Sequence, residues 1–119
     1  MRKTREENPC PMDALLRLLM GPWTTQILWV LRTQGALRFG ALLRQLGQIS
    51  ARVLTQRLRL LEEAGILYRD YRPTVPPEVS YGLTERGRQL GSILDGLNAL
   101  AREWAAEDAP KSDSSGANG

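Results

Sequence analysis

The chain has 119 residues, of which 42% are hydrophobic and 24% charged, which is typical of one globular domain and too short for two. Its net charge of +3 is too small to indicate a nucleic-acid partner unless the basic residues gather on one surface. The sequence has no histidine and a single cysteine, Cys10, which excludes an intrachain disulfide and the usual acid–base, zinc and thiol chemistry, so we expect neither an enzyme nor a cofactor.

The two ends of the chain differ in composition from the middle. Residues 1–9 are charged and polar, and residues 108–119 are rich in Ser, Gly, Ala and Asp. We therefore expect a flexible arm, a folded domain over residues 10–107 and a disordered tail. Asp13 and Arg17 interrupt the only stretch that resembles a signal peptide, and no apolar run approaches the length of a membrane span. With a lone cysteine, these features predict a cytoplasmic protein without a membrane partner.

Two apolar helices are predicted at the start of the domain. Apolar residues recur at helical spacing over residues 12–19, and Gly21–Pro22 ends this first helix. Pro22 is expected at the first position of the next helix, because proline at that position loses no hydrogen bond. The second helix covers residues 23–33 and is apolar on more than one side, which predicts burial on more than one side.

A short helix, a tight turn and a longer helix follow. The short helix covers residues 39–46 and is closed by Gly47. Ser50 is expected to cap the longer helix, which covers residues 51–64 and ends at Gly65. This succession is the pattern of a helix-turn-helix.

The remaining elements are a hairpin and a long helix. Residues 66–71 and 79–83 read as two short strands, joined by a proline-stiffened loop over residues 72–78. Thr84 is expected to cap a last helix whose apolar stripe reaches Trp104. The order predicts an α+β fold, mainly α: a winged helix-turn-helix with an added C-terminal dimerisation helix.

One face of the helix over residues 51–64 carries side chains suited to a major groove. Arginine can donate two hydrogen bonds to guanine, and glutamine can pair with the edge of adenine. The first-turn amides can also meet a phosphate. Taken alone, this face could be merely solvated, but the preceding helix and the following hairpin favour DNA. On this face and at its helix start lie Ser50, Ala51, Arg52, Thr55, Gln56 and Arg59.

Three further arginines are candidates for DNA contact. Arg69 and Arg72 flank the hairpin tip, where guanidinium groups could meet phosphates or enter a minor groove. The alternative is that they serve solubility. Arg38, just ahead of the short helix, is a weaker candidate for a backbone contact.

The apolar stripe of the last helix is longer than one domain of this size needs. Packing within the domain accounts for part of it, and a helix–helix dimer interface with the first two helices accounts for the rest, which suits a two-fold operator. The candidate interface residues are Leu15, Leu19, Trp23, Leu94, Leu97, Ala101 and Trp104.

Cys10 lies between two prolines just before the first helix. A helix N-terminus and nearby basic residues favour a thiolate, so Cys10 is a candidate redox sensor. An inert, partly buried cysteine is an equally open alternative.

An ordered series of motifs runs from residue 10 to about residue 104. The motifs are Cys10-Pro11, Gly21-Pro22-Trp23, Ile27-Leu28-Trp29, Leu37-Arg38-Phe39 with Leu42, Ile49-Ser50, Leu54-Thr55, Leu58-Arg59, Leu61-Glu62, Gly65-Ile66-Leu67, Val75-Pro76-Pro77-Glu78-Val79, Tyr81, and Leu83-Thr84-Glu85 with Gly87. In this order they resemble the HxlR-type winged-helix regulators of bacteria.

The resemblance implies a dimeric DNA-binding regulator whose helix over residues 51–64 enters the major groove. In some relatives the cysteine of the Cys-Pro pair senses oxidants or electrophiles, a role that falls here to Cys10. The chain departs from the family at Pro22, where a basic residue is usual, and at Ala41, where an acidic one is common. With no second cysteine, an intersubunit disulfide is limited to Cys10 with Cys10.

These inferences predict a sequence-specific regulator, with repression as the default, acting as a homodimer on an inverted-repeat operator in double-stranded DNA. A small-molecule or oxidant effector is compatible with this function. The alternative is a winged-helix module that binds protein or RNA. Such a module would be expected to present a more apolar face than Arg52, Gln56 and Arg59 provide.

Overall fold

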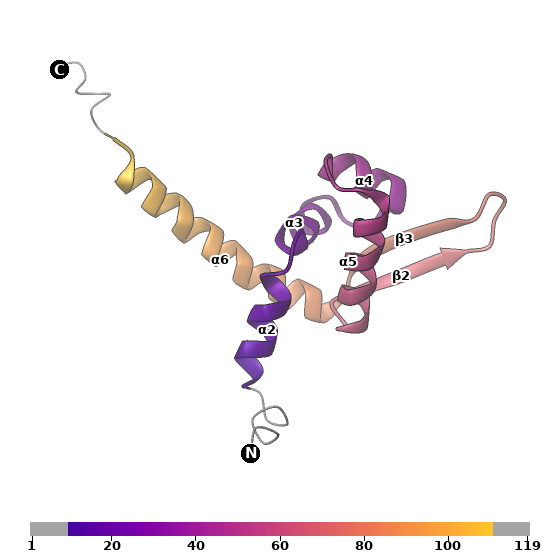
Figure 1. Cartoon of the computed structure of the whole chain (residues 1–119), viewed down its shortest axis with the longest axis horizontal. Coiled ribbons are helices and arrows are strands. Elements are labelled where there is room, and N and C mark those ends of the chain that lie inside the picture. The colour runs from indigo at the N-terminus through magenta and orange to yellow at the C-terminus, as the bar shows by residue number, and fades with distance from the viewer. Residues whose placement is uncertain (1–9, 111–119) are drawn as a thin grey trace.

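The structure is a computed structural model that describes residues 10–110 (Figure 1). The predicted arm lies outside the described residues, as does the predicted tail from residue 111 onward. The elements in chain order are α2 (Pro11–Leu19), α3 (Thr24–Gln34), β1 (Leu37–Arg38), α4 (Phe39–Leu46), α5 (Ala51–Glu63), β2 (Leu67–Arg72), β3 (Glu78–Leu83) and α6 (Glu85–Asp108).

The three strands form one antiparallel sheet in the order β1-β3-β2. Together with the helices, the sheet confirms the predicted winged helix-turn-helix. Strand β1 was not expected, because two residues are too few to show an alternating pattern; Leu37 pairs with Tyr81. The predicted loop over residues 72–78 is also too long, because Arg72 pairs with Glu78 and both belong to strands.

The core lies where α3 and α5 meet the inner face of the sheet. Leucines three and four residues apart on α5 are fully buried, as the helical period predicts. Burying a leucine side chain contributes roughly 1.5–3 kcal/mol, so these contacts hold α5 firmly to the domain. The most deeply buried side chains are Ile27, Leu28, Leu42, Leu54, Leu58, Leu61, Leu67 and Thr24.

Polar caps fix the two helices that follow a turn, as predicted. The Ser50 hydroxyl accepts a hydrogen bond of 3.1 Å from the amide of Val53 at the start of α5. The Thr84 hydroxyl accepts one of 3.1 Å from Gly87 at the start of α6, and it donates to the carbonyl of Gly65 at 2.6 Å. Gly65 has a φ of +79°, which suits glycine at the end of α5.

The joint between α2 and α3 differs from the prediction. Helix α3 begins at Thr24, and Trp23 precedes it as the cap with a φ of +65°. Pro22 therefore lies before the cap and not at the first helical position. The reason is the direction of the chain: α2 and α3 lie at 81° to one another, and Trp23 adopts the left-handed conformation that makes this turn.

Figure 1 shows the β2–β3 hairpin and the far part of α6 projecting from opposite sides of the helical body. Only the first part of α6 is packed, since its buried residues are Gly87, Leu90 and Gly91. Across residues 10–110, no single helix is long and apolar enough to cross a membrane. Helices α2 and α3 taken together have the length and composition of a span, but they are bent by 81°.

Candidate nucleic-acid interface

The outward face of α5 is basic and accessible. Arg52, Gln56 and Arg59 are all exposed, opposite the buried leucines. Within residues 10–110, neither of these arginines forms an ion pair or a hydrogen bond with another side chain. Thr55 is also exposed, and its hydroxyl donates to the carbonyl of Ala51 at 2.8 Å. The predicted recognition residues of this helix therefore share one accessible face.

The first turn of α5 is the place where the sequence predicts a phosphate contact. Ser50 and Ala51 are exposed, and the first-turn amides carry the positive end of the helix dipole. Although the Ser50 hydroxyl already accepts from Val53, its hydrogen is still available for donation. A phosphate that met these groups would lie at the start of the face that carries Arg52.

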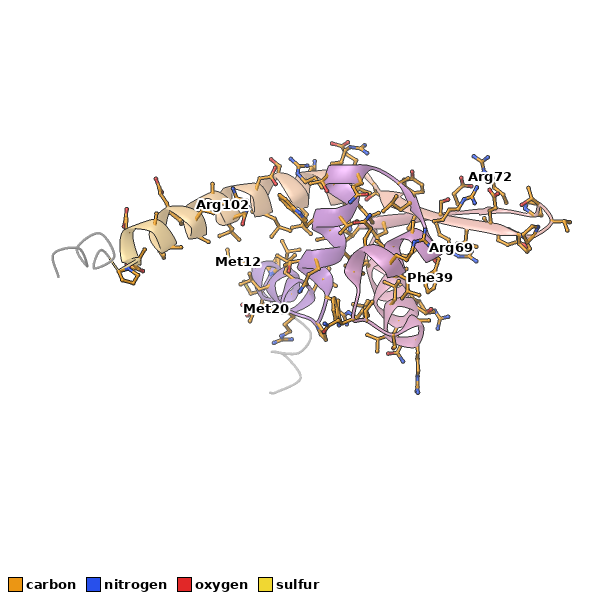
Figure 2. The ribbon with its side chains drawn as sticks, turned by 90° about the horizontal axis from the view of Figure 1, so that it is seen from above. Met12, Met20, Phe39, Arg69, Arg72 and Arg102 are labelled. Carbon is orange, nitrogen blue, oxygen red and sulfur yellow. The ribbon has the colours of Figure 1, made fainter. Side chains whose placement is uncertain are left out.

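The two hairpin arginines do not act from the same side. Arg72 ends β2, whereas Arg69 lies within the strand, opposite Tyr81. Residues an odd number apart on a strand point to opposite faces, and Figure 2 shows Arg69 on the side of Phe39 and Arg72 on the other side. The two arginine side chains therefore leave the hairpin on opposite faces.

The described arginines of the wing already have partners. Arg69 lies over the ring of Tyr71, with 5.7 Å between its guanidinium carbon and the ring centroid. Arg72 forms an ion pair of 3.4 Å with Asp70, and Arg38 forms one of 2.9 Å with Glu78. These pairs are exposed and individually weak, but a phosphate must compete with each carboxylate.

Sequence reasoning missed the aromatic residues of the hairpin. Tyr68 and Tyr71 are both about half exposed. Tyr68 folds over Gly82, where a Cβ would come within 2.5 Å of its ring. The interleaving of tyrosine with arginine in residues 67–72 was the available signal.

A second surface, on α2 and α6, is apolar and exposed. Of the predicted interface residues, Leu15, Leu97, Ala101 and Trp104 are exposed, with Leu97 at 56% and Trp104 at 58%. The other three, Leu19, Trp23 and Leu94, pack in part against the protein's own core. Further exposed apolar residues, outside the list of predicted interface residues, are Met12, Leu16 and Met20 at α2, Ile93 and Leu100 on α6, and Trp29 on α3.

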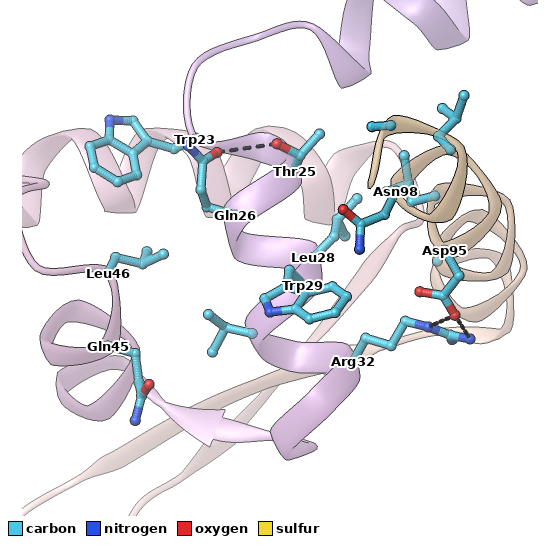
Figure 3. Close-up of a pocket in the computed structure, with 15 residues that line it drawn as sticks. Trp23, Thr25, Gln26, Leu28, Trp29, Arg32, Gln45, Leu46, Asp95 and Asn98 are labelled. Carbon is cyan, nitrogen blue, oxygen red and sulfur yellow. Dashed lines mark hydrogen bonds and ion pairs between the residues drawn. The ribbon is translucent and has the colours of Figure 1, made fainter. Parts of the chain in front are cut away.

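A groove of about 600 Å³ continues this surface between α3 and α6 (Figure 3). Trp29 lies in its middle, with Leu94 and Leu97 of α6 along one wall. Arg32 donates to Asp95 at 2.6 and 2.9 Å and so ties α3 to α6 at one end of the groove. The ion pair adds no net charge, and most of the remaining lining is apolar, including Leu28, Val30 and Leu46.

Cys10 lies apart from the basic face. It is exposed at the N-cap of α2, at the free end of the apolar helix, and its side chain makes no capping hydrogen bond. The same part of the chain, residues 10–110, contains no cluster of three His, Cys, Asp or Glu residues that could hold a metal ion.

Comparison with known proteins agrees with this geometry. The profile of the HxlR-like helix-turn-helix family matches residues 18–109. An uncharacterised HTH-type transcriptional regulator of Synechocystis sp. is 38% identical over 99 residues, covering 83% of this chain and 73% of the relative. The structure of diamide-treated YodB from B. subtilis matches with a TM-score of 0.68 and 32% identity, covering 85% of this chain and 96% of that one. The redox regulator HypR in its reduced form matches with a TM-score of 0.66 and 30% identity, over 88% and 99% of the two chains.

Proposed function

This chain belongs to the family of HxlR-like helix-turn-helix transcriptional regulators, and from that premise we propose that it is a cytoplasmic homodimer that binds an inverted-repeat operator and represses transcription. Members of the family are regulators and generally not enzymes. In this proposal, residues 10–107 are the DNA-binding and dimerisation domain. Repression requires only that the bound dimer occupy DNA that the polymerase needs.

The observation that carries the proposal is the unpaired basic face of α5. Arg52 and Arg59 are exposed and form no ion pair within residues 10–110, in contrast to Arg38 and Arg72, which do. An unpaired guanidinium can make a bidentate contact with guanine without first losing a carboxylate partner. The α5 face is therefore proposed to read bases, and the wing to position the protein on phosphates.

The dimer is proposed to form through the apolar surface of α2 and α6. Helix α2 has no fully buried residue: Leu18 and Leu19 pack in part against the core, and Met12, Leu15 and Leu16 are exposed. On α6, Ile93, Leu97, Leu100 and Trp104 recur at the spacing of a helix–helix seam. A second copy of the chain, laid across these helices and the groove at Trp29, would bury all of these residues.

We also include redox control through Cys10 in the proposed function. Cys10 is exposed at the start of α2, where a covalent bond would act on the proposed dimer surface. One structural neighbour is named a redox regulator. That neighbour's name supports an oxidant as an effector here.

The proposed function is tested by selecting genomic fragments with the purified protein and measuring affinity against salt. Affinity should fall on the order of 10³-fold between 50 and 200 mM salt if about six phosphates are contacted. The selected site should be an inverted repeat with half-sites about one helical turn apart, or a multiple of it. Equal affinity for every duplex, or preference for RNA or for a protein, contradicts the proposal.

A pair of variants separates base reading from general charge. Arg52→Ala/Arg59→Ala should lose selectivity for the selected site. Arg102→Ala/Arg17→Ala removes the same charge from exposed positions on α6 and α2 and should retain it. Equal loss in both pairs would mean that the α5 face does not read sequence.

A further inference from the structure

Arg57 of α5 has no role in the DNA-reading face. At 100° per residue it lies on the same side of the helix as Leu54 and Leu61, three and four residues away. Its Nη2 donates to the hydroxyl of Thr24 at 2.9 Å. Its Nε is buried and finds no hydrogen-bond partner among the described residues. Within residues 10–110 this guanidinium is also without a carboxylate partner, and an arginine remains charged at any physiological pH.

The groups that Arg57 meets belong to the joint between α2 and α3. Thr24 is the first residue of α3 and is completely buried. On the other side the guanidinium lies against Gly21, where a Cβ would overlap Nη2. Trp23, between them, holds the left-handed backbone conformation that sets the angle of 81° between α2 and α3. A single side chain of the recognition helix is thus in contact with both ends of this joint.

Arg57 is half-buried, and withdrawing a charged group from water is unfavourable unless polar neighbours compensate it. Here the compensation comes from the Thr24 hydroxyl. The guanidinium can reach this hydroxyl because Gly21 has no side chain in the way. The contact joins α5 to the first residue of α3, 33 positions earlier in the chain, and the same guanidinium lies against Gly21, just beyond the end of α2. Helix α2 carries the proposed dimer surface, and α5 carries the proposed base-reading face.

We propose that Arg57 is a positioning residue that couples the dimer helix α2 to the recognition helix α5, and so fixes the separation of the two half-sites that the dimer accepts. This inference rests on the proposed operator binding. Arg57 itself does not contact DNA in this arrangement. Its loss changes how strictly the two recognition helices are spaced and leaves the base preference within each half-site unchanged.

Three variants interrupt the contact in different ways. Arg57→Gln removes the guanidinium, and Thr24→Val removes the hydroxyl while keeping the buried volume. Gly21→Ala leaves both groups in place but displaces the guanidinium with its new Cβ, and Gly21 has no positive φ that an alanine would strain. In an Arg57→Gln background the same Gly21→Ala change should have no further effect, because the obstructing Nη2 is gone.

The experiment compares the selected operator with versions that have one base pair added or removed between half-sites. The wild-type protein should discriminate between these spacings. Each of the three variants should bind the parent operator about five- to thirtyfold more weakly and should lose most of the discrimination. Sedimentation and circular dichroism without DNA select the variants that remain folded and dimeric. Gly21→Ala leaves both polar groups in the protein, so this variant still tests the coupling if Arg57→Gln does not fold.

Arg86→Gln is the matched control. Arg86 reaches the other end of α5, donating to the carbonyl of Ala64 at 3.2 Å, and lies outside the joint. It should keep the spacing preference. If folded, dimeric variants of Arg57, Thr24 and Gly21 discriminate spacing as the wild type does, the coupling is refuted while the proposed function stands. If the wild type itself selects no operator, the proposed function fails, and this inference fails with it.

Discussion

At the scale of single residues, the arginines differ in what surrounds them. Arg52 and its neighbour Gln56 on α5 are exposed, and within the described chain no carboxylate pairs with Arg52. Arg38 and Arg72 each hold a carboxylate already. This difference is the basis for proposing base reading for the first pair of residues and backbone contact for the second.

Removing a base-reading side chain should therefore have a local effect. Arg52→Ala or Gln56→Ala should cost about 1–3 kcal/mol of operator affinity and relax the preference at one base position per half-site. Arg72→Ala should weaken binding to all duplexes alike and flatten the salt dependence. Affinities over a library of single-base operator variants provide the measurement. Unchanged selectivity in both α5 variants would show that the reading face has been misassigned.

Removing a competing carboxylate should strengthen binding. Asp70→Asn frees Arg72 for phosphate and removes a negative charge from the wing, so affinity for any duplex should rise about two- to fivefold at low salt. Glu107→Gln removes the same charge from the far end of α6 and should change affinity less. An equal gain in both variants would attribute the effect to net charge alone.

Sequence patterns located the α5 face because helical period and side-chain chemistry are both local. Arg57 could not be assigned in this way. The helical period of α5 places Arg57 on the core side, but nothing in the sequence shows that its partner is Thr24, 33 residues earlier. The ion pair between Arg38 and Glu78 was likewise unpredictable, since it depends on a strand register that brings residues 40 apart together.

At the scale of elements, one glycine is required by close packing. Gly87 is buried near the start of α6, and a Cβ there would overlap the backbone carbonyl of Ile66, which cannot move aside as a side chain can. Gly87→Ala should reduce the free energy of unfolding by about 1–3 kcal/mol. Gly40→Ala, in an open position on α4, should raise it by up to about 1 kcal/mol. Urea denaturation measures both, and a neutral Gly87→Ala would mean that α6 shifts freely on the sheet.

Element boundaries were predictable wherever a capping residue marks them. Ser50 and Gly65 delimit α5, and Gly47 ends α4 as expected. Strand β1 and the true start of α3 were not predictable, because pairing with β3 creates the first and the turn at Trp23 sets the second. These features depend on tertiary contacts more than on local preference.

At the scale of the whole molecule, the exposed apolar surface should control assembly. Leu97→Glu or Trp104→Glu should dissociate the proposed dimer, because an unpaired charge cannot be buried at an apolar contact. Ala106→Glu adds the same charge on the opposite side of α6 and should leave the dimer intact. Sedimentation velocity distinguishes them, and a dimer that persists in both Leu97 and Trp104 variants would place the interface elsewhere.

Oxidation should act on the same assembly through Cys10. Two Cys10 thiols and one peroxide give one disulfide and two waters, which would link two α2 helices at their N-termini. Operator affinity should change on oxidation and recover with a thiol reductant. Cys10→Ser should abolish the response. Non-reducing electrophoresis and intact mass distinguish a crosslink from a mixed disulfide with a small thiol, and an unaltered response in Cys10→Ser would show that Cys10 is not the sensor.

Because only the first part of α6 is packed, a small tilt of the helix there gives a larger displacement at its far end. Only its first residues are buried, so about 20 Å of helix beyond Leu94 extends from the body, at 1.5 Å per residue. A tilt of about 10° at the packed end displaces the other end by about 3.5 Å, close to the rise of about 3.4 Å between base pairs. In a dimer joined along this part of α6, a small rotation of the helix at its packed end would shift one recognition helix relative to the other by about one base pair. Fine adjustment of the operator that such a dimer accepts thus requires no change in any residue that touches a base.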